Sequence, residues 1–209
     1  MLKFTLHDQA RIRFYWDGAA LQAHAEAMGD PSLNWLDLPA LGRACGFDAA
    51  HVWFAPTPPV DRAGREPVGA YAKALRGLGV ESRAPAGPGI ETECLRCGHG
   101  WREIRAASDL NLALAVLEDA VADVCDMAFV FTSVHVLRSL EGSLARLFPD
   151  KGLGRVSVGS ARGRRHDVPV LTLRSTQIAA ARLSLPDGAR RSPLRFRQSI
   201  QPAAEEASP

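Results

Sequence analysis

Residues 11–21 read RIRFYWDGAAL, and this stretch decides how the rest of the chain is interpreted. Its first half alternates and carries bulky side chains, which predicts a β-strand over 11–16. Asp17-Gly18 ends the strand, and a helical pattern begins at Ala19. Ligands of open parallel sheets bind at the carboxyl ends of the strands. Asp17 is therefore a candidate metal-site or phosphate-site residue.

Strand-like and helix-like stretches alternate along the whole chain. The predicted strands are 11–16, 50–55, 80–83, 127–131 and 155–158, and the predicted helices are 19–28, 69–78, 108–124 and 134–148. A helix opened by Pro39, a loop over 56–67 and a short helix in the tail beyond Leu171 complete the set. This alternation implies right-handed β-α-β crossovers. The predicted fold class is α/β, a three-layer α/β/α sandwich around a central, mostly parallel sheet.

Length and composition favour one globular domain with room for a smaller appendage. The chain has 209 residues, of which 46% are hydrophobic and 23% are charged. No apolar run reaches the roughly 18 residues of a membrane-spanning helix, so we expect no membrane partner. The first residues lack the apolar core of a signal peptide, and four cysteines do not make a disulfide framework in a chain this long. We therefore expect a cytoplasmic protein.

The charge is unevenly distributed along the chain. Residues 151–209 carry eleven Lys and Arg against four acids, a net charge of +7, which leaves −5 for residues 1–150 within the overall +2. A basic C-terminal third is compatible with a polyanionic partner, and a solvated Arg-rich surface is the alternative. We expect one domain over 1–160 and a basic extension over 161–209 with a disordered end.

Three segments carry a further pattern. Asp-Gly ends the first predicted strand at 17–18, SDLNLA at 108–113 opens the best predicted helix, and a polar turn, TSVH at 132–135, follows the fourth predicted strand. In this order the chain resembles NYN-domain proteins, a branch of the PIN-like ribonuclease superfamily, over roughly residues 11–160. The resemblance implies a PIN-like fold, RNA as the partner and a divalent metal, Mg²⁺ or Mn²⁺, as the cofactor.

The resemblance also implies roles for individual residues. PIN-like nucleases hydrolyse phosphodiesters with metal held by clustered acids. Asp17 and Asp109 match that cluster as metal ligands, with Ser133 or His135 as further catalytic candidates. Ser133 and His135 stand where the family has two aspartates, and Ala20 stands where it has an asparagine, so the active site is divergent.

Two functions from different classes are therefore expected. The first is a metal-dependent ribonuclease-lineage protein that acts on RNA by phosphodiester hydrolysis if it is active. The alternative is a catalytically degenerate domain that binds RNA or a protein partner. An interaction domain that forms a homodimer without metal is a third interpretation.

Each candidate residue also has a plainer structural interpretation. Asp17 is the type of residue that caps a following helix. Asp109 would be an acid in the first turn of its helix, favoured by the helix dipole, with Ser108 as the N-cap. His135 is either a surface or cap residue or a ligand of a softer metal such as Mn²⁺ or Zn²⁺.

The other acids nearby in the sequence do not complete a metal site. Glu118 and Asp119 lie roughly 14–15 Å along the helix from Asp109, too far for one ion. Asp126 precedes the fourth predicted strand and should lie at the opposite edge of the sheet. The glycines of KGLGRVSVG at 151–159 precede a strand, so we expect no nucleotide cofactor.

A second candidate metal site lies in an expected loop insertion at 84–101. Cys94 and Cys97 have the spacing of half a zinc knuckle, and His99 follows. No second Cys-x-x-Cys is present, and the remaining cysteines, Cys45 and Cys125, have the apolar context of core residues. Zinc would need a distant fourth ligand or a second subunit, and a metal-free knuckle is the alternative.

Overall fold

The computed structural model contains one large sheet, one small sheet and six helices within its described part. It describes residues 10–30, 33, 35–45, 51–55, 62–82, 90–93, 100–103, 105–158 and 168–183. No helix among these residues has the length and apolarity needed to cross a membrane.

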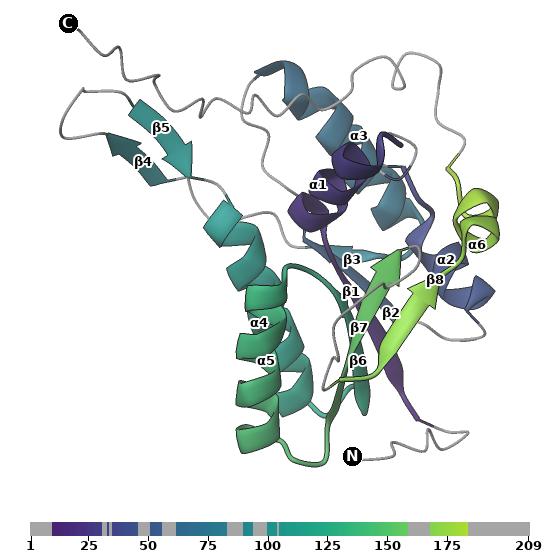
Figure 1. The fold of residues 1–209 in the computed structure, drawn as a ribbon, viewed down its shortest axis with the longest axis vertical. Helices are drawn as coiled ribbons and strands as arrows, with labels where there is room; N and C mark the ends of the chain where they lie inside the picture. The colour runs from purple at the N-terminus through teal and green to yellow at the C-terminus, as the bar shows by residue number, and fades with distance from the viewer. Residues whose placement is uncertain are drawn as a thin grey trace, which may run out of the picture.

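All neighbouring strands of the large sheet run parallel. Its members are β1 (Ile12–Asp17), β2 (His51–Ala55), β3 (Glu81–Ser82), β6 (Met127–Phe131), β7 (Gly152–Val158) and β8 (Val170–Leu173). They lie in the order β3-β2-β1-β6-β7-β8. Numbered in chain order, these strands give 3-2-1-4-5-6, the doubly wound arrangement. The polypeptide thus winds outward from β1 toward β3, returns to β6, and winds outward again toward β8 (Figure 1).

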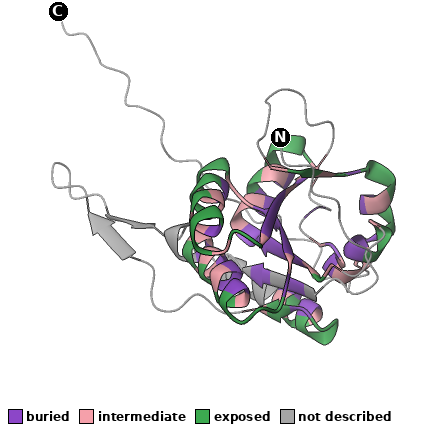
Figure 2. Ribbon diagram, turned by 90° about the horizontal axis from the view of Figure 1, so that it is seen from below, coloured by how far each residue is buried: buried purple, intermediate pink, exposed green. Residues whose placement is uncertain are grey.

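Helices cover both faces of the sheet. One face carries α1 (Gly18–Met28), α2 (Leu38–Ala44), α3 (Arg62–Gly77) and α6 (Ser175–Ala180), and the other carries α4 (Arg105–Val121) and α5 (Val134–Leu147). Side chains alternate along β1, so that Phe14 and Trp16 join the first core and Tyr15 joins the second. Buried positions concentrate on the strands and on the inward sides of the helices (Figure 2). The predicted three-layer α/β/α sandwich is confirmed.

The two helices of the first crossover begin and end where local chemistry predicts. Asp17 is the N-cap of α1, and Gly29 ends that helix in the left-handed conformation with φ of 63°. Pro39 stands in the first turn of α2 behind the N-cap Asp37, as predicted.

Several element boundaries differ from the prediction. Helix α3 begins at Arg62, inside the segment predicted as a loop. Pro67 is its sixth residue and lies beyond the first turn, where proline is normally disfavoured, so local propensity predicted the loop. Helix α4 begins at Arg105. Ser108 is therefore buried inside the helix and is not its N-cap, since the preceding Ala-Ala pair favours helix.

Strand β7 begins three residues earlier than predicted, and it includes two glycines. A Cβ on Gly154 would lie 2.5 Å from a ring carbon of Phe129, so only glycine fits beside that ring. Glycine is depleted in strands except where another group approaches closely. This close approach explains why composition alone placed the strand start too late.

The folded unit extends beyond the boundary predicted at residue 160. Strand β8, which the sequence did not predict, pairs with β7. Leu173, Ile178 and Ala181 of the β8–α6 segment are buried in the first core. The boundary therefore lies at or beyond Leu183, the last described residue of this segment.

The predicted insertion at 84–101 contains a small antiparallel sheet. Its strands are β4 (Ile90–Glu93) and β5 (Gly100–Glu103), with Glu93 opposite Gly100. Cys94, Cys97 and His99 belong to the segment between these strands and lie outside the described residues, as does most of the predicted extension.

Candidate functional site

The strand order creates a switch point between β1 and β6. The connections that leave these neighbouring strands go to opposite faces of the sheet, to α1 and to α5. Ligands of doubly wound folds bind outside the carboxyl ends of the strands at such a point. Asp17 ends β1 there, and Thr132 and Ser133 follow β6. Asp17 and Ser133 were candidates from the sequence, and Thr132 lies within the polar turn quoted at 132–135.

Asp17 is buried, and its carboxylate is engaged by uncharged donors. The residue is 1% exposed. Oδ1 accepts hydrogen bonds from the backbone N–H groups of Ala19 at 2.9 Å and Ala20 at 3.3 Å, and Oδ2 accepts one from Thr132 Oγ1 at 3.1 Å. Asp17 therefore caps α1 and links the ends of β1 and β6.

At the β6–α5 junction, no N-cap side chain accepts a hydrogen bond from the backbone N–H groups that begin α5. Ser133 is the N-cap residue of α5 by backbone conformation, but its side chain makes no capping hydrogen bond. His135, in the first turn, is exposed, and its carbonyl accepts a hydrogen bond from Ser139 Oγ at 3.1 Å. The first backbone N–H groups of an uncapped helix favour an anion.

Asp109 lies in a different setting from the one predicted. Because α4 begins at Arg105, Asp109 is the fifth residue of the helix and is not a first-turn acid. Helix α4 connects parallel strands, so it runs antiparallel to them and begins near their carboxyl ends. Asp109 is half-buried near that start, on the same edge of the sheet as Asp17.

The described residues do not fit a metal-dependent nuclease centre. Among them, no group of three or more His, Cys, Asp or Glu side chains is arranged to hold a metal ion. Mg²⁺ and Mn²⁺ favour octahedral oxygen sites, and the carboxylate of Asp17 has three of its acceptor positions occupied within the protein. Asp17, Asp109 and His135 thus share one edge without forming a ligand set.

Two buried ring nitrogens beside the switch point were not predicted. Trp16 stacks on Phe131 with ring centroids 5.2 Å apart, and His24 of α1 meets the same ring edge-on at 6.0 Å. Trp16 Nε1 and His24 Nε2 have no hydrogen-bond partner among the described residues. Burial lowers the pKa of His24. Tryptophan and histidine within amphipathic patterns resemble ordinary core residues, so no sequence signal marked them.

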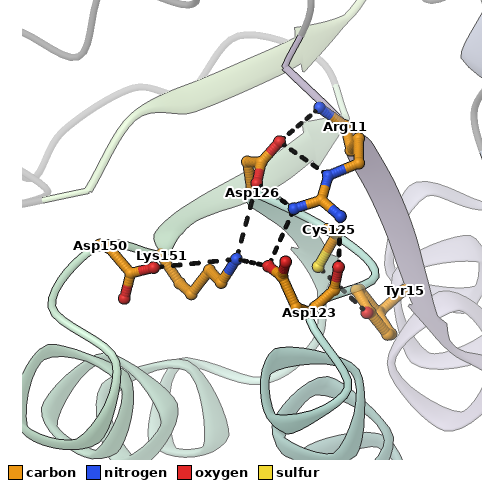
Figure 3. Close-up of polar contacts among 7 residues, drawn as sticks. All are labelled: Arg11, Tyr15, Asp123, Cys125, Asp126, Asp150 and Lys151. Atoms are coloured by element: carbon orange, nitrogen blue, oxygen red, sulfur yellow. Dashed lines mark hydrogen bonds and ion pairs between the residues drawn. The ribbon is translucent and has the colours of Figure 1, made fainter.

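The opposite, amino-terminal edge of the sheet carries an ion-pair network. It consists of Arg11, Asp123, Asp126 and Lys151 (Figure 3). Arg11 donates to both oxygens of Asp126, at 3.1 and 2.7 Å, and to Asp123 Oδ1 at 2.9 Å. Lys151 donates to Asp123 and lies 3.5 Å from Asp126.

The network shifts the pKa values of its carboxyl groups. Hydrogen bonds from the Arg11 side chain and backbone hold the pKa of Asp126 far below its usual range. Hydrogen bonds from Lys151 and Arg11 lower the pKa of Asp123. The prediction that Asp126 lies opposite the candidate site is confirmed, and one basic residue of the C-terminal third, Lys151, is committed to this edge.

The two described cysteines are free thiols. Cys125 is buried, as predicted, and its Sγ lies 3.8 Å from the Tyr15 hydroxyl. Cys45 is half-buried against the first core. Burial raises the pKa of both thiols, so neither has the lowered pKa of a reactive cysteine.

Fold and site together define a doubly wound α/β domain whose switch point carries a buried aspartate and a helix start without a side-chain cap. No protein-family model matches the chain, and no curated protein matches it. A crystal structure of a protein of unknown function from Vibrio parahaemolyticus is similar, with a TM-score of 0.54 and 16% sequence identity. The match covers 85% of this chain and 99% of that one. At this identity the likeness supports the fold alone.

Proposed function

We propose that this chain is an RNA-binding domain of the PIN-like lineage in which metal-dependent hydrolysis has been lost. The observation that carries the proposal is the environment of Asp17. Its carboxylate caps α1 and accepts a hydrogen bond from Thr132. Among the described residues, Asp17 belongs to no group of three or more acids, histidines or cysteines that could hold a metal ion. A nuclease of this class needs clustered carboxylates to hold its metal.

RNA would bind at the carboxyl edge of the sheet. The uncapped start of α5 offers backbone N–H groups to a phosphate, with His135 exposed beside them. Arg138, one turn into α5, and Arg174, at the end of β8, add exposed cations. Lys and Arg contacts to phosphates supply most of the affinity for RNA and make it depend on salt.

The first experiment combines cleavage and binding. Labelled single-stranded RNA is incubated with the protein and Mg²⁺ or Mn²⁺, beside EDTA and Asp17→Asn controls, and the same mixtures are run on a retardation gel. We expect retarded, intact RNA in every lane. Metal-dependent cleavage that Asp17→Asn abolishes would overturn the proposed loss of hydrolysis, and unretarded RNA would overturn the binding function.

Two exposed arginines of α5 provide a matched test of where RNA binds. Arg138→Ala should weaken binding and reduce the salt slope by roughly one, the expected change for one phosphate contact. Arg146→Ala, in the last turn of the same helix, should change neither. Equal behaviour of the two arginine variants would reject this edge as the binding surface.

Removing residues 187–209 should also weaken RNA binding and flatten its salt dependence.

An active ribonuclease is the second candidate, favoured by the position of Asp17 at the switch point. In that case Mn²⁺ would raise the melting temperature, and Asp17→Asn would abolish the increase without changing the metal-free fold. An increase that persists in Asp17→Asn would remove Asp17 as a ligand.

Zinc at Cys94, Cys97 and His99 remains a separate proposal, which metal analysis of the purified protein beside Cys94→Ser tests directly.

The proposed location is the cytoplasm, where free thiols such as Cys45 and Cys125 remain reduced. Fractionation of the source cells tests this proposal, and recovery of the protein outside the cytoplasm would reject it.

A further inference from the structure

Helix α4 carries apolar side chains on two opposite sides. Leu112, Val116 and Ala120 are buried in the second core. The opposite side faces outward and carries a second apolar row, which we call the α4 stripe: Leu110, Leu114, Leu117 and Val121. Leu110 is 59% exposed and Val121 is 73% exposed, whereas a surface helix normally places polar residues on its outer side. The α4 stripe is therefore an apolar surface that the fold of one chain does not explain.

The spacing within the α4 stripe is that of a helix–helix contact. Its members follow one another at intervals of four, three and four residues, and Val124, just beyond the helix, is exposed at the next interval of three. This alternation is the heptad pattern by which one helix packs along another. Helices α4 and α5 form the outer layer on this face of the sheet (Figure 1). The described part of the chain supplies no further helix to cover the stripe.

The charges beside the α4 stripe indicate what kind of surface would cover it. After Arg105, α4 has three acids and no lysine or arginine, whereas α5 has two arginines and one glutamate. Glu118 lies on the flank of α4 that faces β3, since it lines a pocket with the residues of β3, and α5 packs over β7 on the other side. An acidic flank disfavours a polyanion such as RNA and favours a basic helix. The α5 helix of a second copy has the required charge.

We propose that the α4 stripe is the interface of a homodimer in which the α4 helices of two copies pack in parallel. A twofold rotation about an axis along the stripe sets one row against the other and carries α5 of the second copy to the Glu118 flank. Both α4 and α5 end at the amino-terminal edge of the sheet, since each leads into a parallel strand. Glu118 and Arg146 lie in the last turns of their helices, so they pair across the interface, once on each side of the axis.

Both helices of the layer are needed to make a sufficient interface. A specific dimer buries about 800 Å² on each partner, more than one short helix row provides. Leu147, at the end of α5, is also exposed and adds apolar surface at the end of the layer where Val121 lies. The start of α5 lies at the opposite end, so the dimer leaves the proposed RNA-binding edge accessible. We therefore expect a dimer of moderate affinity that forms without RNA.

Sedimentation equilibrium of the whole chain, after nuclease treatment, tests dimer formation over a range of micromolar concentrations. We expect the mass to rise from that of one copy to that of two. Leu114→Glu should raise the dimer Kd by about tenfold or more, because it places like charges at the centre of the interface. Met28→Glu, at an exposed position of α1 on the other face of the sheet, is the matched control and should leave the Kd unchanged. A wild-type monomer at every concentration would overturn the proposal.

A second variant separates loss of the dimer from loss of the fold. Leu110→Gln changes the most exposed leucine of the α4 stripe, so circular dichroism should show an intact fold. It should also raise the dimer Kd by about tenfold, because two buried leucines are lost from each dimer. A folded variant at either position, Leu110→Gln or Leu114→Glu, that keeps the wild-type Kd would overturn the proposal.

Exchanging two charges tests the parallel arrangement. Glu118→Arg and Arg146→Glu should each raise the dimer Kd by roughly fivefold, and the double variant should restore it, because the pair forms across the interface. Glu118→Arg combined with Arg138→Glu is the control, since Arg138 lies near the opposite end of α5 and should not restore the Kd. Equal recovery in both double variants, or recovery in neither, would overturn the parallel arrangement.

Discussion

The two edges of the parallel sheet use charged residues in opposite ways. At the amino-terminal edge, Arg11 and Lys151 pair with Asp123 and Asp126 in one connected network (Figure 3). At the carboxyl edge, the hydrogen bonds found for Asp17 come from two backbone N–H groups and a hydroxyl. The first edge joins opposite charges, whereas the second holds a buried carboxylate with neutral donors.

This difference separates an edge that carries exposed ion pairs from an edge that carries a buried carboxylate and a helix start without a side-chain cap. The ion-pair network ties the start of β1 to the α4–β6 turn, more than a hundred residues away in sequence, and it ties that turn to the start of β7. Asp123 adopts a left-handed backbone conformation with φ of 54°, which aspartate tolerates better than most residues. The carboxyl edge instead keeps an uncapped helix start at α5.

The largest effect is expected from breaking the cap at the carboxyl edge. Asp17→Ala should lower the free energy of unfolding by about 2–3 kcal/mol, because it removes an N-cap and leaves buried donors without an acceptor. Asp17→Asn should cost under about 1 kcal/mol, since asparagine also caps helices. Urea denaturation measures both variants. A cost for asparagine as large as that for alanine would show that the negative charge itself is required.

The position of Asp17 was readable from the sequence because strand, turn and cap signals are all local. The continuous apolar run at 127–131 was an equally clear signal, and it forms β6, whose five residues are all buried. Strand β8 was missed because it is a four-residue edge strand with exposed positions, and it lacks a continuous apolar run. Pairing decided its structure, and pairing between distant strands leaves little local signal.

The charged contacts could not be predicted for a related reason. Arg11 and Asp126 are 115 positions apart, and no periodic pattern connects them. Arg13 occupies an alternating strand, where a charged residue normally indicates a solvent-facing side. Here α4 covers that side, so Arg13 is buried with Asp119. The sequence therefore predicts the strands and caps well, and it predicts the polar groups between layers poorly.

A smaller effect is expected at the amino-terminal edge. Asp126→Ala should lower the free energy of unfolding by about 1 kcal/mol, since its side chain is 38% exposed and exposed ion pairs contribute little. Asp150→Ala is the matched control, because Asp150 is 74% exposed and lies 3.9 Å from Lys151. It should change nothing measurable. High salt should narrow the difference between the two variants, and a salt-independent difference would contradict the electrostatic explanation.

The same network should produce a loss of stability in acid. The pKa values of Asp126 and Asp123 are lowered in the folded protein, relative to about 3.9 in the unfolded chain. Their contribution is therefore fully present above about pH 4 and is lost as the pH falls through the folded-state values. Denaturation between pH 2 and pH 6 measures this loss. Asp126→Asn should show a shallower decline, and an unchanged slope would exclude Asp126 as a source.

The smallest effect is expected from His24, close to the carboxyl edge. Burial lowers its pKa below the ordinary value of about 6.5, so the folded state favours the neutral ring. The resulting stabilisation is complete above about pH 6.5 and is lost as the pH falls below it, because the unfolded chain takes up the proton more readily. His24→Leu keeps an apolar contact with Phe131 and should flatten stability between pH 5 and pH 7. A slope that survives in His24→Leu would assign the titration to another group.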